Sequence, residues 1–288
     1  MCIRDRVWDL DDPFWYPATK QAYRTAKILN FDITVFAPKG RGEAGTLEMV
    51  HFLKKVLEER YDGICISPIA DLRVEKLLQK MAEKGVEVIF ILSAFDSVPY
   101  RTLIGTDSYQ CGRSTGEAVR EALGADGAVG IIKWKDNLIE TVEDRYHGVV
   151  DVLKENRIPY YDMTGPGEPT AEEATKLTDR LLTEHPDISV LCATNVGWGL
   201  AFARYLKSKG KKVKLVTVDF TDEVGEFMKA GYVDAAIAQR PESWGSMTLE
   251  KIEAVFEGQS IPKTIDTGTY PVTPVSYTHL TLPTTPYV

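Results

Sequence analysis

Polar and aromatic side chains follow several short apolar runs in this 288-residue sequence, and an arginine lies on a neighbouring segment. These residues are Asp12, Phe14, Trp15, Ser67, Ser93, Lys133, Trp134, Arg145, Asn195, Asp219 and Gln239. Hydroxyl groups need both hydrogen-bond donors and acceptors, so this mixture suits a neutral, polyhydroxylated small molecule. Aromatic faces cover its apolar C–H side, and each hydrogen bond to a charged group contributes roughly 1.5–3 kcal/mol.

Some of these residues also fit a purely structural role. Asp12-Pro13 is a good helix start, with an acidic N-cap followed by proline at the first helical position. Asn195 and Asp219 equally fit as caps of the helices that follow them. Each residue taken singly can be a cap, whereas the whole set at the ends of several strands favours a binding site.

The elements that must position these residues alternate between apolar runs and amphipathic segments. We predict strands at 32–37, 62–67, 86–92, 101–105, 128–132, 188–193, 213–218 and 233–238. Predicted helices include 46–60, 73–84, 109–123, 140–156, 171–184, 198–209 and 222–230, with a capping box at Thr170–Glu173. Continuous apolar strands are typical of parallel sheets covered on both faces, so the sequence predicts an α/β fold.

The number of strands is too large for one compact half, so we expect two similar α/β lobes. The break falls near Gly105-Thr106-Asp107, where a short strand meets a new helix. In open parallel sheets, ligands bind beyond the carboxyl ends of the strands, where the polar residues above are expected.

Composition and charge exclude several classes of protein. With 44% hydrophobic residues the chain can form a core, and no run approaches the roughly 20 apolar residues of a membrane-spanning helix. A net charge of −8 without a basic cluster argues against nucleic-acid binding by this portion. Four cysteines in so long a chain form no disulfide scaffold.

No catalytic or metal-binding motif emerges, so we expect a binding protein, not an enzyme, with no cofactor and no metal ion. The sequence has no P-loop and no H-E-x-x-H motif. The scattered histidines are expected at helix surfaces or ends, and the cysteines in structural positions. These residues are His51, His147, His185, Cys65, Cys111 and Cys192.

The segment 40–45 (GRGEAG) is a literal G-x-G-x-x-G between a predicted strand and a predicted helix. It supports an NAD-dependent dehydrogenase as a less favoured alternative. A dinucleotide site needs an acidic residue at the carboxyl end of the next strand, whereas Asp62 lies at the amino end of that strand.

Both ends of the chain resemble translated sequencing-adapter DNA. Residues 1–6 (MCIRDR) can be encoded by a short DNA whose reverse complement encodes Val-Ser-Tyr-Thr-His, the residues at 275–279. We expect 1–6 and 275–288 to be artefactual tails and exclude them from the predicted fold. On this expectation, nothing about a signal peptide follows from the first residues.

An ordered series of motifs resembles the ribose-binding type of periplasmic sugar-binding proteins. Asp12-Pro13-Phe14-Trp15 is similar to the family's Asn-Pro-Phe-aromatic entry, and Arg145-Tyr146-His147-Gly148 to its Arg-x-x-Gly helix. The other matching segments are 61–68 (YDGICISP), 104–107 (IGTD) with Gly112, 185–187 (HPD), 193–195 (ATN), 218–221 (VDFT) and 238–241 (AQRP). They occur in the family's order across residues 7–274.

The resemblance implies a ligand contact at each matching position. Phe14 and Trp15 would stack on a sugar ring, and Asp12 would stand where the family usually has asparagine. The residues that would bind ring oxygens and hydroxyls are Arg145, Asn195, Asp219 and Gln239.

The sequence departs from the family in two places. Ser93-Ala94 replaces the family's Asp-Arg after the fourth strand, with Asp96 slightly downstream. The aromatic expected before the helix at 171 falls near Pro169, and Trp134 or Trp198 are the candidates to replace it, although tryptophan at helical spacing is more often core. These departures argue against simply assigning ribose.

The resemblance also implies two Rossmann-like lobes with parallel sheets joined by a hinge, the periplasmic binding protein-like I fold. One lobe would be 7–106 plus 240–263 and the other 107–239 plus 264–274, with hinges near Gly105, Gln239 and Pro262. A small sugar or polyol would be trapped between the lobes and presented to the permease of an ABC transporter or to a sensor. Such a protein is expected to be monomeric and to lie in the periplasm or on the cell surface as a lipoprotein.

A second alternative is the ligand-sensing domain of a lac-repressor-type transcriptional regulator, which shares the two-lobed fold. Its DNA-binding head would precede residue 7. The upstream sequence distinguishes the two, because a signal peptide supports export and a helix-turn-helix supports regulation. The Pro13-Phe14-Trp15 entry favours the exported binder.

Overall fold

A computed structural model of the chain describes residues 2–6, 15–39, 42–59, 61–124, 126–134, 140–167 and 169–280. Residues 2–6, 140 and 278–280 are described by their backbone alone. The chain forms two compact units, Met1–Asp107 with Arg240–Gly268 and Ser108–Gln239 with Thr269–Val288.

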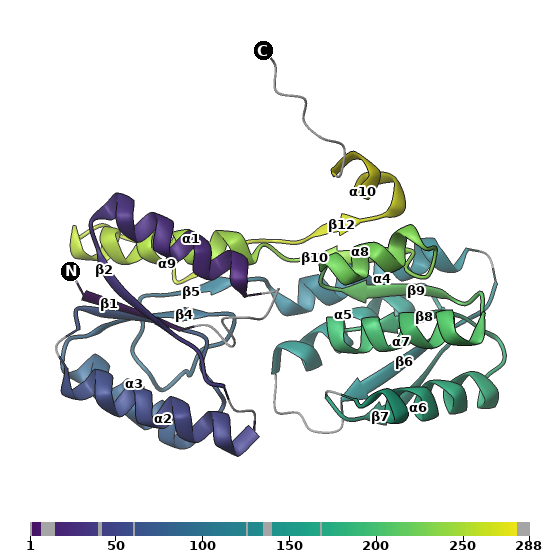
Figure 1. Cartoon of the computed structure of the whole chain (residues 1–288), viewed down its shortest axis with the longest axis horizontal. Helices are drawn as coiled ribbons and strands as arrows, with labels where there is room; N and C mark the ends of the chain where they lie inside the picture. Colours follow the sequence, from purple (N-terminus) through teal and green to yellow (C-terminus); the bar gives the residue numbers. More distant parts are fainter. Residues whose placement is uncertain are drawn as a thin grey trace, which may run out of the picture. The chain divides into compact units, whose positions relative to one another are not determined.

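The first unit has a six-stranded sheet in the order β11-β5-β4-β3-β1-β2, with every neighbouring pair parallel. Its strands are β1 (Cys2–Arg6), β2 (Asp32–Phe36), β3 (Gly63–Ile66), β4 (Glu87–Ile91), β5 (Thr102–Gly105) and β11 (Thr264–Asp266). Its helices are α1 (Tyr16–Leu29), α2 (Gly42–Glu58), α3 (Leu72–Glu83) and α9 (Pro241–Phe256). Helices α1 and α9 lie side by side over one face of the sheet, and α2 and α3 cover the other (Figure 1).

The second unit repeats this plan with the order β12-β10-β9-β8-β6-β7, in which only the β10–β12 pair is antiparallel. Its strands are β6 (Ala128–Trp134), β7 (Tyr160–Gly165), β8 (Ile188–Ala193), β9 (Lys214–Val218), β10 (Ala235–Ala238) and β12 (Tyr270–Val272). Its helices are α4 (Ser108–Leu123), α5 (Glu140–Glu155), α6 (Ala171–Glu184), α7 (Val196–Lys209), α8 (Asp222–Lys229) and α10 (Pro274–Leu280).

Both sheets are buried on both faces, which explains their continuous apolar strands. In β3, Ile64 and Ile66 pack towards α2 and α3, while Cys65 between them packs towards α1 and α9. In β8, Leu191 and Cys192 likewise belong to cores on opposite faces. The predicted α/β fold with parallel sheets is therefore confirmed.

The division of the chain between the units differs from the predicted lobes near residue 264. Strand β11 pairs with β5 in the first unit, with Ile265 opposite Ile104, so the last crossing lies at Gly268 and not near Pro262. Residue 107 also belongs to the first unit. The sequence does not predict this pairing, because the three residues of β11 are too few to show which strand they join.

The described parts of both tails, residues 2–6 and 275–280, form secondary structure in the two units. Cys2–Arg6 forms β1, which lies between β2 and β3, and 274–280 forms α10. Strand pairing uses backbone groups that every residue except proline carries in full, so residue types alone do not exclude a segment from a sheet.

Helix α1 begins at Tyr16 with Pro17 in its first turn, so the start of this helix lies later than Asp12-Pro13. The capping box of α6 is confirmed, because the Thr170 hydroxyl accepts from the Glu173 amide while the Glu173 carboxylate accepts from the Thr170 amide. No helix within the described residues is long and apolar enough to cross a membrane.

Candidate ligand-binding site

Three predicted site residues follow neighbouring strands of the second unit, directly after their carboxyl ends. Asn195 comes after β8, Asp219 after β9 and Gln239 after β10. Their side chains are buried, with exposures of 8%, 6% and 4% respectively. Because β8, β9 and β10 are adjacent and parallel, the structure gathers these polar groups at one edge of the sheet.

Asp219 is not a helix cap. Thr221 caps α8 with its hydroxyl, whereas Asp219 has a φ of 70°, in the left-handed region that few residues other than glycine adopt. The Asp219 carboxylate accepts a hydrogen bond of 2.6 Å from Nε2 of Gln239. The structural interpretation therefore fails for Asp219, which is held facing Gln239 at the sheet edge.

Asn195 does act as a cap. Its Oδ1 accepts a 2.8 Å hydrogen bond from the amide of Trp198 and so caps α7. The structural interpretation is thus confirmed for this residue. The cap uses only the amide oxygen, so a contact between the amide nitrogen and a ligand stays a prediction.

Arg145 lies on α5 with only 5% of its surface exposed. Its Nη1 donates to the carbonyl oxygen of Thr194, next to Asn195, over 3.3 Å. Its Nε has no hydrogen-bond partner in the described part of the chain, and the same holds for Oε1 of Gln239. A buried polar atom without a partner costs roughly 1–3 kcal/mol, so two of them at one edge indicate a place for a polar ligand.

The described site residues predicted in the first unit are buried or half-buried, and they do not gather at one sheet edge in the way that Asn195, Asp219 and Gln239 do. Trp15 is 5% exposed and packs in the core, with its ring centroid 5.5 Å from that of Trp244. Ser93 is half-buried and follows Leu92, whose φ of 66° is left-handed like that of Asp219. Asp12 and Phe14 lie outside the described residues.

Leu92 and Asp219 occupy equivalent places in the two units. Strand β4 precedes Leu92 and strand β9 precedes Asp219, and these strands hold the same position in the two sheet orders. A left-handed residue directly after the strand turns the chain sharply in both units. Leucine tolerates this conformation poorly, so the left-handed turn reflects the backbone path that the two units share and not a preference of the side chain.

Of the two tryptophans proposed to replace the missing aromatic, Trp198 is core. It is 1% exposed, and its Nε1 donates to the carbonyl oxygen of Pro166 over 2.9 Å. Trp134, at the end of β6, is half-buried and packs against Gly167, and its Nε1 is buried without a partner among the described residues. Trp134 thus remains the candidate, and its contact with a ligand stays a prediction.

The residues assigned structural roles from the sequence are in structural places. His51 and His147 are exposed on helices, and His185 caps α6 and stacks on Tyr161. The cysteines Cys65, Cys111 and Cys192 are buried, and burial raises the pKa of the Cys192 thiol to about 12. Over the described ranges, no three His, Cys, Asp or Glu residues gather to hold a metal ion.

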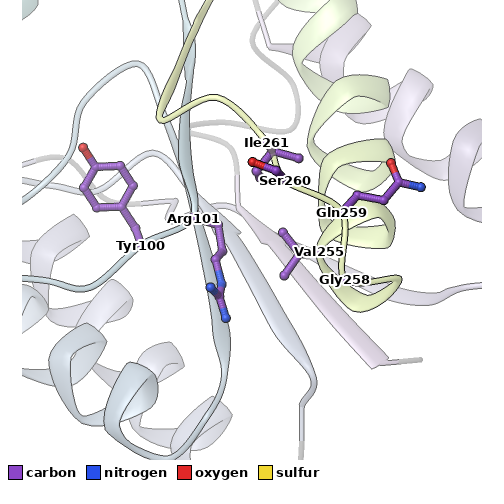
Figure 2. A pocket seen from close by; sticks show the side chains of 7 residues that line it. All are labelled: Tyr100, Arg101, Val255, Gly258, Gln259, Ser260 and Ile261. Atoms are coloured by element: carbon purple, nitrogen blue, oxygen red, sulfur yellow. The ribbon is translucent and has the colours of Figure 1, made fainter.

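A cavity of about 430 Å³ lies in the first unit, away from these residues (Figure 2). It is lined by Tyr100, Arg101, Val255, Gly258, Gln259, Ser260 and Ile261. The Arg101 guanidinium is already bound by Glu87 through two hydrogen bonds. No buried unpartnered polar atom is found among the lining residues, so this cavity lacks the feature that marks the candidate site.

Residues 7–260 match the model of the periplasmic binding protein domain, which is most of the chain. The chain belongs to this family. The ribose import binding protein of Bacillus subtilis (strain 168) is 21% identical to this periplasmic binding protein over 90% of this chain and 83% of its own. The solute-binding protein of an ABC transporter from Burkholderia graminis, solved with D-arabinose, has a TM-score of 0.83 at 22% identity and covers 95% of both chains. A protein of the same kind from Actinobacillus succinogenes, with bound D-allose, has a TM-score of 0.84 at 20% identity, covering 96% and 99%.

Family membership decides among the alternatives left open by the sequence. The matched model and the named relatives of this periplasmic binding protein favour a solute-binding protein over a transcriptional regulator or a dehydrogenase. Asp62 also precedes β3, at the amino end of that strand, as the argument against a dinucleotide site expects.

Two features of the site go beyond the sequence predictions, and the second of them leaves a pattern in the residue types. The carbonyl oxygen of Thr194 is a backbone group, so no residue type could reveal its bond to Arg145. Gly112 packs directly against the backbone of Arg145, and its spacing of four residues from Gly116 within α4 is a pattern that could have shown the close helix contact.

Proposed function

We propose that this periplasmic binding protein captures a neutral monosaccharide or a related polyol and delivers it to the permease of an ABC transporter. It acts by binding and carries out no chemical step. As an exported protein it would work in the periplasm or at the cell surface as a lipoprotein, and as a monomer.

The observation that carries this proposal is a pair of buried polar atoms at the sheet edge that have no hydrogen-bond partner among the described residues. Nε of Arg145 is a donor and Oε1 of Gln239 is an acceptor, which together match a hydroxyl-rich molecule. One buried arginine and one buried aspartate, Asp219, supply opposite charges, which favours a ligand without net charge.

Several sugars are compatible with the proposed site. The relatives named above carry ribose in their name, or D-arabinose or D-allose in their solved complexes, so both pentoses and hexoses are candidates. The departures at Ser93 and near Pro169 point away from simple transfer of any one of these ligands.

Closure of the two lobes on the ligand is a prediction of the resemblance. Small-angle scattering with and without the bound sugar measures it directly. A decrease in the radius of gyration on binding is expected, and an unchanged value contradicts closure.

The direct test is a thermal-shift panel of pentoses, hexoses and polyols, followed by calorimetry with the sugar that stabilises most. Arg145→Met should abolish the stabilisation, because it removes the guanidinium and keeps most of the apolar volume. Arg180→Met is the matched control, since Arg180 is exposed on α6 and forms an ion pair with Glu184 of the same helix. A panel without any stabilising sugar, or equal affinity in both variants, contradicts the proposal.

A further inference from the structure

Helices α4 and α5 of the second unit approach each other so closely that their backbones touch. A Cβ added to Gly112 of α4 would lie 2.2 Å from the carbonyl oxygen of Arg145, and 2.7 and 2.8 Å from its Cα and C. These are backbone atoms, which a side-chain rotation cannot move away. Only glycine at position 112 therefore allows α5 to lie where it does.

The contact is reciprocal and is reinforced on both sides. A Cβ added to Gly148 of α5 would lie 2.2 Å from the carbonyl oxygen of Tyr109. The Tyr109 hydroxyl donates to Asp151 over 2.8 Å, and the Arg113 guanidinium donates two hydrogen bonds of 2.8 Å to Glu155. We call this set the α4–α5 seam; its members are Tyr109, Gly112, Arg113, Gly148, Asp151 and Glu155.

The α4–α5 seam sets the position of the Arg145 backbone, and a hydrogen bond at the candidate site holds the guanidinium at the far end of the side chain. The Arg145 backbone rests on Gly112, while its Nη1 bonds to the Thr194 carbonyl and its Nε remains without a partner among the described residues. A displacement of α5 therefore moves the guanidinium relative to the β8 edge.

We infer that Gly112 is a positioning residue for ligand binding, because its lack of a side chain sets the reach of Arg145 into the site. This inference rests on the proposed function. Gly116, one turn further along α4, packs against the side chain of Val152, with its added Cβ 2.8 Å from the Val152 Cβ. It shares the close helix contact but does not touch Arg145, so it is the matched control.

The test compares Gly112→Ala with Gly116→Ala. Both variants crowd the same pair of helices, so both should lower the melting temperature. Calorimetry with D-ribose, D-arabinose and D-allose then measures affinity below the melting transition. We expect Gly112→Ala to weaken the sugar bound by the unmodified protein by roughly 10-fold or more, the value of a displaced hydrogen bond to a charged group. Gly116→Ala should stay within about twofold.

A second pair of variants avoids any steric clash and serves if Gly112→Ala does not fold. Arg113→Gln removes one ion pair between α4 and α5, whereas Arg120→Gln removes a bond to Glu117 within α4. The inference predicts weaker sugar binding in Arg113→Gln alone.

The outcomes of these tests distinguish a failure of the positioning role of Gly112 from a failure of the proposed function. Equal losses of affinity within each pair, or no loss in either, overturn the positioning role of Gly112 and leave the proposed function standing. If the unmodified protein binds none of the three sugars nor any other sugar of the panel, the proposed function fails first and the inference falls with it.

Discussion

Replacement of Gln239 by methionine should weaken ligand binding while leaving the stability of the free protein nearly unchanged. The Gln239 amide donates a 2.6 Å hydrogen bond to the Asp219 carboxylate, which contributes roughly 1.5–3 kcal/mol to folding. Its Oε1 is buried without a partner among the described residues, at a cost of roughly 1–3 kcal/mol. Methionine loses the first contribution and relieves the second, so the net change in the free energy of unfolding should lie within about 2 kcal/mol.

The affinity for the ligand should fall even where the free energy of unfolding is nearly unchanged. A ligand hydroxyl that donates to Oε1 would lose its acceptor, and the calorimetric Kd should rise by roughly 10-fold or more. Urea unfolding measures the stability, and calorimetry with the sugar selected by the thermal-shift panel measures the affinity.

The control for this substitution is Thr178→Val. Thr178 is fully buried in the same unit, and its hydroxyl is satisfied by the carbonyl oxygen of Ala174. This variant should alter stability and leave the affinity unchanged. If Gln239→Met lowers the free energy of unfolding by more than about 4 kcal/mol and leaves Kd unchanged, Gln239 is a structural residue and the reasoning is refuted.

Three further predictions follow from individual contacts. Trp15→Ala should destabilise the protein by roughly 3–5 kcal/mol in urea unfolding, because Trp15 is buried against Trp244; a loss below about 1 kcal/mol would show that it is not part of the core. Burial and the hydrogen bond to Asp162 raise the pKa of Tyr146, so the native state keeps a proton that the unfolded chain loses near pH 10, and stability should fall as pH rises above that value. Tyr146→Phe should flatten this decline in urea titrations between about pH 9 and pH 11, and an unchanged slope contradicts the assignment. Thr170→Ala should cost about 1 kcal/mol through loss of the α6 cap, and a change near zero in the same assay would show that the capping box is not needed.

The sequence predicted the fold well because parallel strands buried on both faces leave an unmistakable pattern. Runs such as 62–67 and 188–193 are mostly apolar, and the structure has β3 and β8 there. The positions of Asn195, Asp219 and Gln239 followed directly, since residues after adjacent parallel strands share one sheet edge.

The sequence could not decide which of these residues are caps. Asn195 and Asp219 have the same local context of a strand end followed by a helix, yet only Asn195 caps its helix. For Asp219 the outcome depends on the left-handed backbone and on Thr221, which lies two residues later and takes the capping role. Such a choice depends on backbone angles that side-chain types do not reveal.

Contacts between segments far apart in the chain could not be predicted from the sequence either. Trp15 was expected to stack on a ligand, but its environment depends on Trp244, a residue of α9 far along the chain. Strand β11 gave no sequence signal because its three residues are too few to show a period, and its pairing with β5 is decided by tertiary structure.

A crystal structure of the protein with the sugar that the thermal-shift panel selects tests the ligand site directly. We predict sugar oxygens within about 2.7–3.2 Å of Arg145 Nε and Gln239 Oε1, so that both atoms acquire partners on binding. A sugar bound elsewhere, with neither atom in contact with it, would show that this sheet edge is not the ligand site.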